Sequence, residues 1–317
     1  MSISKNMTDH GYDVIGDIHG HADALCRLLI KLGYAELQGV FRHDSRKVIF
    51  VGDFVDRGPE QIEVLRIARK MCEAGTASAV LGNHEFNAIG WATSDGSGGH
   101  LRKHSKKNDG QHAEFLSQLG EGSLHHDNAI NWFRQLPVWL DLPGFRVVHA
   151  CWHDRSRVAL RPYLDAGNRL TDEGIREAHH RGSEAYKAVE ILLKGPEQRL
   201  PVGKSFVDQS GNKREEVRLR WWDPDATTFR KAAIGVDDQL EELPNDKITT
   251  DFQYLDSTPV LFGHYWILGE PTIINSRAAC LDFSVARSGY LTAYRWSAEP
   301  ELSSKNLVYV PAESPLV

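Results

Sequence analysis

The chain has 317 residues, of which 41% are hydrophobic and 25% are charged. These fractions are those of an ordinary soluble globular protein with a sizeable core, and they exclude global disorder. The net charge of −6 gives the chain no bulk electrostatic reason to coat nucleic acid or an anionic membrane surface. No apolar run approaches the ~18 residues of a membrane span, so we expect no membrane partner.

The compartment is predicted from the amino terminus and the cysteines. The first residues, MSISKNMTDHGY, contain no apolar stretch, which argues against a secretory signal. The four cysteines are scattered and form neither a C-x-x-C pair nor a disulfide framework. The sequence therefore predicts a reducing, cytoplasmic location. Histidine stands out, with 15 copies.

The first third of the chain alternates between two patterns. A β-type run at 13–16 precedes a helical spacing of apolar residues from Ala24 to Leu32, which Gly33 ends. A fully apolar run at 48–51 is typical of a buried parallel strand, and a second helix follows Pro59. Further strands are predicted at 77–81, 146–149 and 260–264, and 278–284 with 290–296 as a hairpin. Strand, polar loop and helix in repetition predict an α/β fold with functional loops at the carboxyl ends of strands.

Two segments interrupt this rhythm. Residues 96–126 are polar and predict an excursion of loop and helix. Residues 151–255 contain charged helical patterns over 171–194 and later Gly and Pro punctuation. Because the strand-and-loop pattern resumes at 260–264, we interpret 151–255 as an inserted cap or lid within a single catalytic domain spanning 1–317.

Five polar clusters each follow an apolar run, and they offer oxygen and nitrogen ligands without sulfur. They are Asp17-Ile18-His19-Gly20, Gly52-Asp53-Phe54-Val55-Asp56-Arg57-Gly58, Gly82-Asn83-His84-Glu85, Val148-His149 and Gly263-His264. Carboxylate, carboxamide and imidazole together suit Mn, Fe or Zn. Six candidate ligands exceed what one metal needs, and they fit two metals about 3.5–4 Å apart that share a carboxylate.

In order and spacing these clusters resemble the calcineurin-like metallophosphoesterase superfamily, with D-x-H, G-D-x-x-D-R-G, G-N-H-E, H and G-H in that order. The resemblance covers about 13–150 and 259–296. It implies an α/β fold, a four-layer α/β/β/α sandwich with an inserted cap region. The D-R-G and G-N-H-E forms resemble the phosphoprotein phosphatase branch, whereas the segment from Leu281 to Arg295 looks more like bacterial diadenosine tetraphosphatase-related proteins.

The resemblance also implies a role for each cluster. Two divalent metal ions are expected, with Mn first and Fe, Zn, Ni or Co as alternatives, and a hydroxide bridging them would attack phosphorus in line. The implied ligands are Asp17, His19 and His264 for one metal, Asn83 and His149 for the other, and Asp53 as the bridge. Arg57 would hold phosphate oxygens, and His84, oriented by Asp56, would protonate the leaving oxygen. Glu85 would support these residues from behind.

Several residues have two possible interpretations. His153 competes with His149 as a ligand, although His149 ends its strand. Trp221 and Asp223, in a segment resembling L-W-x-D-P, lie near the substrate cleft or else the tryptophans pack the lid onto the core. Lys204, Arg220 and Arg287 are either extra phosphate contacts or solvated surface residues. A third metal site is conceivable in 100–126, but loop histidines exposed to solvent are the default there: His100, His104, His112, His125 and His126.

The function predicted from these features is hydrolysis of phosphate monoesters by a di-metal phosphoesterase resembling serine/threonine protein phosphatases. The alternative is a bis(5′-nucleosyl)-tetraphosphatase or another nucleotide or RNA-end phosphatase. A non-catalytic metal-binding scaffold is the weakest reading, because every ligand position and the acid histidine are present. The expected partner is a phosphorylated substrate, either a phosphoprotein or a nucleotide.

Overall fold

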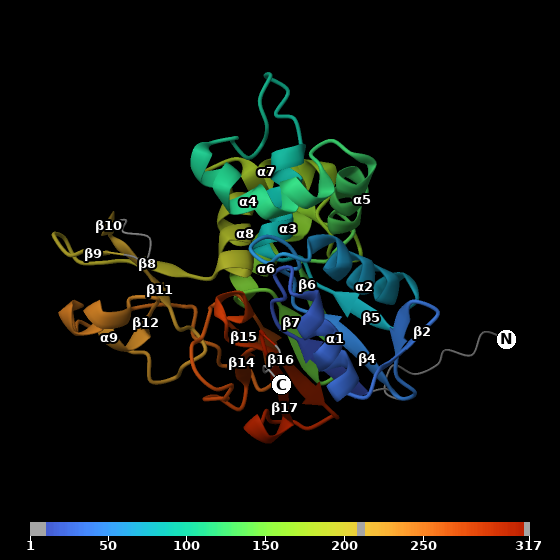
Figure 1. The fold of residues 1–317 in the computed structure, drawn as a ribbon. Coiled ribbons are helices and arrows are strands. Elements are labelled where there is room, and N and C mark those ends of the chain that lie inside the picture. Colours follow the sequence, from blue (N-terminus) through green and yellow to red (C-terminus); the bar gives the residue numbers. More distant parts are fainter. Residues whose placement is uncertain (1–10, 208–212, 314–317) are drawn as a thin grey trace.

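The computed structural model describes residues 11–207 and 213–313, drawn in Figure 1. Residues 1–10, on which most of the prediction about a secretory signal rests, lie outside the described residues. The described chain is an α/β protein in which two sheets stack face to face and helices cover both outer faces. This is the predicted four-layer α/β/β/α sandwich. Among the described helices, none is long and apolar enough to cross a membrane.

The first sheet carries three of the polar clusters at one edge. Its parallel strands are β1 (Gly11–Ile15), β4 (Arg46–Phe50) and β5 (Ala77–Ala79). Antiparallel strands β16 (Tyr290–Trp296), β17 (Leu307–Pro311) and β15 (Asp282–Phe283) complete it. Helices α1 (Ala22–Lys31) and α2 (Gln61–Glu73) pack on its outer face, close to the predicted positions. Because parallel strands end at the same edge, the loops after β1, β4 and β5 meet there.

The second sheet carries the other two clusters. Its order is β14 (Ala278–Cys280), β13 (Val260–Phe262), β7 (Phe145–Val148) and β6 (Trp139–Leu142). β14, β13 and β7 run parallel, so the residues after β7 and β13 also share an edge. The outer face packs against α6 (Asp154–Leu160) and α8 (Glu184–Lys194), and the Ala150 amide donates to the Leu192 carbonyl at 3.0 Å.

The hairpin predicted from 278–284 and 290–296 is wrong in its first strand. Residues 278–280 pair in parallel with β13 in the second sheet, and only 282–283 pair with β16 in the first. The chain changes sheets at Leu281, whose amide still donates to the Phe262 carbonyl at 2.7 Å. Both strands are buried on both faces, so the apolar pattern shows no break at the crossing.

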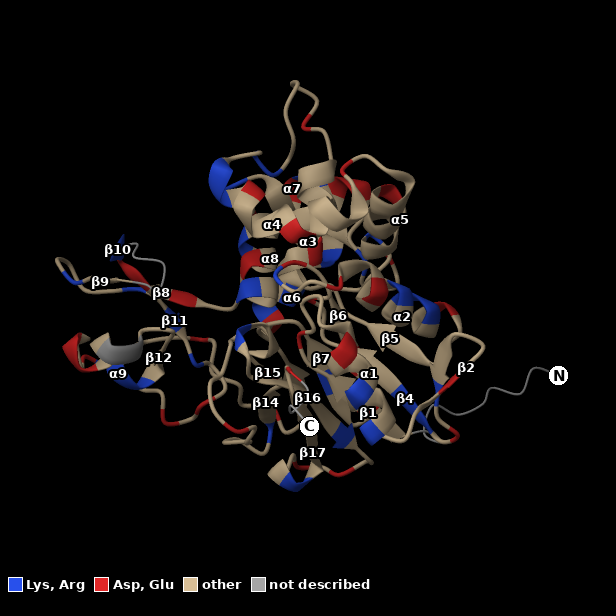
Figure 2. Ribbon diagram, in the orientation of Figure 1, with Lys and Arg blue, Asp and Glu red and all other residues tan. Residues whose placement is uncertain are grey.

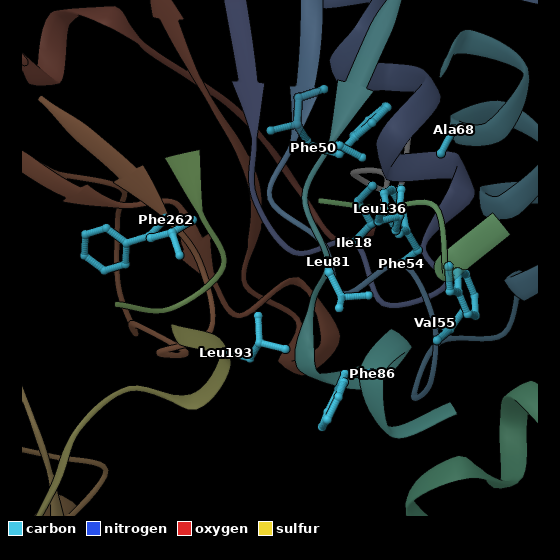
Figure 3. Close-up of a cluster of buried hydrophobic side chains, with 14 of the residues drawn as sticks. Ile18, Phe50, Phe54, Val55, Ala68, Leu81, Phe86, Leu136, Leu193 and Phe262 are labelled. Atoms are coloured by element: carbon cyan, nitrogen blue, oxygen red, sulfur yellow. The ribbon is translucent and has the colours of Figure 1, made fainter. Parts of the chain in front are cut away.

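Alternating residues of the strands divide the apolar side chains between two clusters. Residues that point between the sheets include Val14, Ile49, Val147, Leu261 and Ala279. Their neighbours point outward, under the helices, and include Ile15, Phe50, Val148, Phe262 and Cys280. Figure 3 shows part of this outer cluster, which also contains Phe54 and Val55 of a polar loop. The loops are therefore anchored in the core that the strands build.

The 96–126 excursion is largely helical. It contains α4 (Lys106–Leu119) and the start of α5 (Leu124–Phe133), which lie close to α3 (Asn83–Ala92) in Figure 1. Minor elements are β2 (Ala35–Leu37), β3 (Val40–Arg42) and the short 3-10 helices η4 (Val285–Arg287) and η5 (Ser304–Asn306).

Residues 151–255 fall into two parts. In the first, α6, η2 (Arg161–Tyr163), α7 (Asp172–His179) and α8 contribute to the outer core cluster. The second has its own small apolar cluster and extends away from the sheets in Figure 1. It comprises β8 (Glu197–Arg199), β9 (Phe206–Val207), β10 (Lys213–Arg214), β11 (Glu216–Leu219), α9 (Phe229–Ala232), β12 (Ala233–Ile234) and η3 (Asp237–Glu242). Residues 208–212 of this segment lie outside the described residues, and its role as a cap stays a prediction.

A buried carboxylate ties the strands of the first sheet together at the end away from the polar loops. Asp13 is fully buried on β1 and accepts hydrogen bonds from Arg46 Nε at 3.0 Å, Arg295 Nε at 3.1 Å and the Tyr34 hydroxyl at 3.0 Å. Both arginines would lose their shared partner if this carboxylate were removed.

We therefore expect Asp13→Ala to lower the free energy of unfolding by about 3–5 kcal/mol, because it leaves partly buried positive charge uncompensated. Urea denaturation measures this loss. The control is Glu73→Ala, which removes the exposed Arg69–Glu73 pair and should cost less than about 1 kcal/mol. Equal losses in the two variants would contradict the role given to Asp13.

Candidate metal centre

The five polar loops meet at one place between the two sheets. Asp17 and Asp53 follow β1 and β4, Asn83 begins α3, and His149 and His264 follow β7 and β13. Each of these side chains is buried, as is His19 two residues after Asp17. The structure thus brings together all six residues that were predicted to hold metal.

The loops adopt backbone conformations that few side chains favour. His19, Asp53 and His264 have φ of 46°, 51° and 77°, in the left-handed region. Two glycines allow the close approach: a Cβ on Gly82 would lie 2.3 Å from Asp53 Oδ1, and one on Gly263 would lie 1.9 Å from Asp17 Oδ1. Such left-handed residues cost about 1–3 kcal/mol each and persist where the surrounding packing enforces them.

Asp53 lies at the middle of the cluster. Its Oδ2 is 3.6 Å from His19 Nε2 and 3.9 Å from His84 Nε2, while its Oδ1 is 3.4 Å from His149 Nε2. Ligand atoms within 4.8 Å of one another form two groups, one of His19, Asp53 and His84 and one of Asp53, His149 and His264. Because Asp53 belongs to both groups, its carboxylate has the position expected of a bridge.

The position of His264 differs from the one implied by the resemblance. Its backbone N–H donates to Asp17 Oδ2 at 3.0 Å, so the main chain faces Asp17. The ring turns the other way, with Nδ1 2.7 Å from Asn83 Oδ1, and Asn83 Oδ1 is also 3.0 Å from His149 Nε2. His264 therefore groups with Asn83 and His149, not with Asp17 and His19.

The donor set fits divalent cations. Asp17 Oδ1, His19 Nε2 and His264 Nε2 are buried and have no hydrogen-bond partner among the described residues. His19 Nδ1 lies 2.9 Å from the Val55 carbonyl and His149 Nδ1 lies 2.8 Å from the Val51 carbonyl, so each ring donates there and keeps an Nε2 lone pair for the centre. Leaving buried lone pairs unpaired is costly, and a cation would remove that cost.

The pKa shifts of Asp17 and His19 also favour a bound cation. Burial, followed by the negative charge of Asp282, raises the pKa of Asp17 well above its ordinary range. Burial, followed by the charge of Arg57, lowers the pKa of His19 well below its ordinary range. A positive ion would stabilise the ionised carboxylate of Asp17 and the neutral imidazole of His19, which are their ligand forms. At His149 burial lowers the pKa, but the carboxylate of Asp53 outweighs burial and raises it to about 10.

Beside the centre, Asp56 and His84 form a short contact, with His84 Nδ1 2.5 Å from Asp56 Oδ2. Burial lowers the pKa of His84, but the carboxylates of Asp53 and Asp56 outweigh burial and raise it. Arg57 Nη2 lies 3.5 Å from His84 Nε2, so the predicted acid and the predicted phosphate-binding guanidinium face the same space.

Glu85 holds the loop that carries Asp53. Its carboxylate accepts the backbone N–H groups of Asp53 and Phe54, both at 2.8 Å, and that of Gly82 at 3.2 Å. This agrees with the supporting position expected for Glu85.

Some sequence readings need correction. His112 and His126, given solvent exposure by default, are buried, and His112 Nδ1 lies 2.8 Å from Asp56 Oδ1. The signal was present, because His112, Phe115 and Leu119 are spaced as the buried face of a helix. His100 and His104 stack on each other, and no third group of metal ligands occurs in the described ranges.

The packing of His153 and Trp221 decides between the alternatives left open for these two residues. His153 turns away from the centre, with Nδ1 2.8 Å from Ser156 Oγ and Nε2 3.7 Å from Asp251. Trp221 is buried in the core, and its indole N–H lies 3.1 Å from the Ala150 carbonyl and 2.9 Å from the Tyr265 hydroxyl. Trp221 therefore packs this segment onto the second sheet.

Trp266 is a residue that the sequence did not single out. Its indole ring lies under two guanidiniums, with the Arg57 Cζ 3.5 Å and the Arg287 Cζ 4.5 Å from the ring centroid. Its backbone has φ 51° and donates to Asp282 Oδ2 at 2.8 Å. The ring thus places two cationic side chains next to the centre.

A cavity of about 1500 Å³ opens beside Asn83 and His84, and nine Lys and Arg residues line it together with six Asp and Glu residues and many apolar ones. Figure 2 marks Lys and Arg, and also Asp and Glu, on α4, on α8 and in the β8–β11 region. The basic lining residues are Arg57, Arg102, Lys107, Arg181, Lys194, Arg214, Arg218, Arg220 and Arg287. Arg220 and Arg287 are thus at the cavity, whereas Lys204 is exposed and does not line it.

Comparisons with known proteins find similarity to phosphoesterases. The family model described as calcineurin-like phosphoesterase matches residues 12–196. The chain is 47% identical over 74 residues to the asymmetrical bis(5′-nucleosyl)-tetraphosphatase PrpE of Halalkalibacterium halodurans, which covers 23% of this chain and 30% of that protein. The chain thus spans less than a third of that relative's length.

Other similarities extend further along the chain. The symmetrical bis(5′-nucleosyl)-tetraphosphatase of Ralstonia nicotianae is 26% identical over 318 residues, covering 94% of this chain and 93% of that protein. A solved structure of a serine/threonine phosphatase from Saccharomyces cerevisiae aligns with 99% of this chain and 82% of that one, at 14% identity and a TM-score of 0.49.

Metal binding tests whether His149 or His153 is a ligand. We expect metal-depleted protein to take up about two Mn²⁺ ions per chain, as two ligand groups sharing one carboxylate require. His149→Ala should reduce this number or weaken affinity at least about 10-fold, whereas His153→Ala should bind like wild type. Calorimetric titration measures both. Loss of an ion from His153→Ala alone would overturn the ligand set.

Proposed function

The chain belongs to the calcineurin-like phosphoesterase family, and on that premise we propose that it is a two-metal phosphohydrolase acting on nucleoside polyphosphates, dinucleoside tetraphosphates in particular. The observation that carries the proposal is the cavity beside the ligand cluster, in which nine Lys and Arg residues outnumber six Asp and Glu residues. The names of the similar proteins agree with it, including one aligned along 94% of the chain.

We assign the ligands as Asp17, His19 and Asp53 for one cation, and Asp53, Asn83, His149 and His264 for the other. Mn²⁺ is our first expectation. The pair would supply an activated water and neutralise charge on the phosphoryl oxygens.

The protein's own groups then orient and protonate the substrate. The planar fork of Arg57 binds two phosphoryl oxygens, and the Trp266 ring beneath it limits the orientations of the guanidinium. His84 gives its Nε2 proton to the leaving oxygen while Nδ1 stays bonded to Asp56. Arg57 lies close enough to His84 Nε2 for both to contact one phosphoryl group.

The second guanidinium distinguishes a polyphosphate from a monoester. Arg57 and Arg287 contact the same indole, so a substrate that Arg57 binds presents its next phosphoryl group near Arg287. Arg218 and Arg220 extend the basic wall from there. A phosphopeptide is the second candidate substrate, because the D-R-G and G-N-H-E motifs resemble those of phosphoprotein phosphatases.

A substrate panel tests the proposal. With Mn²⁺, we expect the highest kcat/KM for a dinucleoside tetraphosphate, lower values for p-nitrophenyl phosphate and a phosphopeptide, and none after metal removal. Asn83→Ala and His84→Ala should lower kcat at least about 100-fold while leaving the fold intact by circular dichroism. Preference for the phosphopeptide would replace the substrate assignment, and full activity in both variants would refute the enzymatic one.

Arg287 should contribute to the binding of polyphosphates but not of phosphate monoesters. Arg287→Ala is expected to raise KM for the dinucleoside tetraphosphate about 10-fold, since one charge-assisted bond is worth about 1.5–3 kcal/mol, and to leave p-nitrophenyl phosphate nearly unchanged. Steady-state kinetics on both substrates measure this. The control is Lys204→Ala, which changes an exposed cation away from the cavity lining. A similar loss on both substrates would contradict a second phosphoryl contact.

A further inference from the structure

We propose that His112, on α4, is a positioning residue that fixes the acid His84 through the carboxylate between them; the inference rests on the proposed phosphohydrolase function. Asp56 bonds an imidazole on each of its oxygens, with Oδ2 2.5 Å from His84 Nδ1 and Oδ1 2.8 Å from His112 Nδ1. The three side chains come from a loop, from α3 and from α4, and all are buried.

Among the described residues, the two imidazoles are the hydrogen-bond partners of the Asp56 carboxylate. Its backbone is left-handed, with φ 68°, and its N–H donates to Gln61 Oε1 at 2.8 Å. Gln61 in turn donates to the Gly58 carbonyl at 2.6 Å, which fixes the loop. Since the residue is 2% exposed, loss of either imidazole would leave a buried carboxylate oxygen without a protein partner. The direction of the carboxylate is therefore set by the two imidazoles.

The surroundings of His112 define which nitrogen carries the proton. Its Nε2 is buried with no hydrogen-bond partner in the described part of the chain, and its ring packs 4.7 Å from that of Phe115. With the proton on Nδ1, the ring donates to Asp56 and leaves no buried N–H unpaired at Nε2. His112 thus holds one carboxylate oxygen, and the other oxygen orients His84.

The helix that carries His112 is joined to the helix that carries His84. Arg102 donates to Asn87 Oδ1 of α3 at 2.7 Å and to Asn108 Oδ1 and Gln111 Oε1 of α4 at 3.1 and 2.9 Å. The helix therefore presents His112 at a defined distance from the active centre. This gives the 96–126 excursion a role in catalysis, because it supplies the outer partner of the acid's carboxylate.

A positioning role has a signature that a structural role lacks. Protonation of the leaving oxygen matters for poor leaving groups and little for good ones. We expect His112→Phe, which keeps a ring but removes the donor, to lower kcat about 10- to 100-fold on phenyl phosphate and less than about 3-fold on 2,4-dinitrophenyl phosphate. His112→Asn, which retains a donor near the Nδ1 position, should restore most of the loss.

The experiment uses the full chain loaded with Mn²⁺, with metal content and thermal unfolding recorded for each variant. The matched control is His126→Phe, a buried histidine 5.6 Å from the same Phe115 ring, which should behave as wild type on both esters. If His112→Phe does not fold, His112→Leu takes its place. Equal losses on the two esters, or no loss on either, would overturn the inference.

A second readout does not need activity. In protein loaded with diamagnetic Zn²⁺ instead of Mn²⁺, the His84–Asp56 hydrogen bond should give a far-downfield imidazole proton resonance, which we expect to shift or broaden in His112→Phe and to stay in place in His126→Phe. A wild-type protein that hydrolyses no phosphoester would refute the proposed function. An unchanged resonance in His112→Phe would refute the positioning role whether or not the enzyme is active.

Discussion

The arrangement of the centre depends on the contacts of the Asp53 carboxylate. It approaches His19 and His149 from opposite oxygens, and its Oδ1 also accepts the His84 backbone N–H at 3.0 Å. That last bond fixes the start of α3, so the same carboxylate sets the position of His84, which we propose as the acid. Its own loop is left-handed and is held by Glu85. A shift of Asp53 would therefore disturb both ligand groups and the acid together.

The sandwich explains how residues so far apart in sequence reach one carboxylate. The first sheet supplies Asp17, Asp53 and Asn83 from the ends of parallel strands, and the second supplies His149 and His264 in the same way. The apolar layer between the sheets holds these two edges in register. Because the ligands sit on loops whose neighbours are core residues, such as Phe54 and Val55, the packing energy of the core enforces the strained backbone of the site.

The features that the sequence predicted well are local motifs. The features that it missed depend on contacts between residues far apart in the chain. The motifs identify the residues that meet at the centre, because each cluster closely follows its strand. The direction of the His264 ring follows from a bond between its backbone and Asp17, 247 residues away. The partner of His112 lies 56 residues away, and only its helical spacing hinted at burial. The crossing at Leu281 leaves no mark in the apolar pattern because the chain is buried on both sides of it.

The cavity shows why net charge predicts so little about the substrate. The chain carries −6, yet nine Lys and Arg residues line the cavity, drawn from loops, α4, α8 and the small β-region after residue 196. Most of these lie outside the motifs, in the segments whose pattern was least informative. Some already pair with carboxylates, as Arg218 does with Glu197 at 3.9 Å, so a polyanion would compete with an existing ion pair. We therefore propose that the motifs beside the strands encode the chemistry, whereas charges on the segments inserted between them contribute to substrate choice.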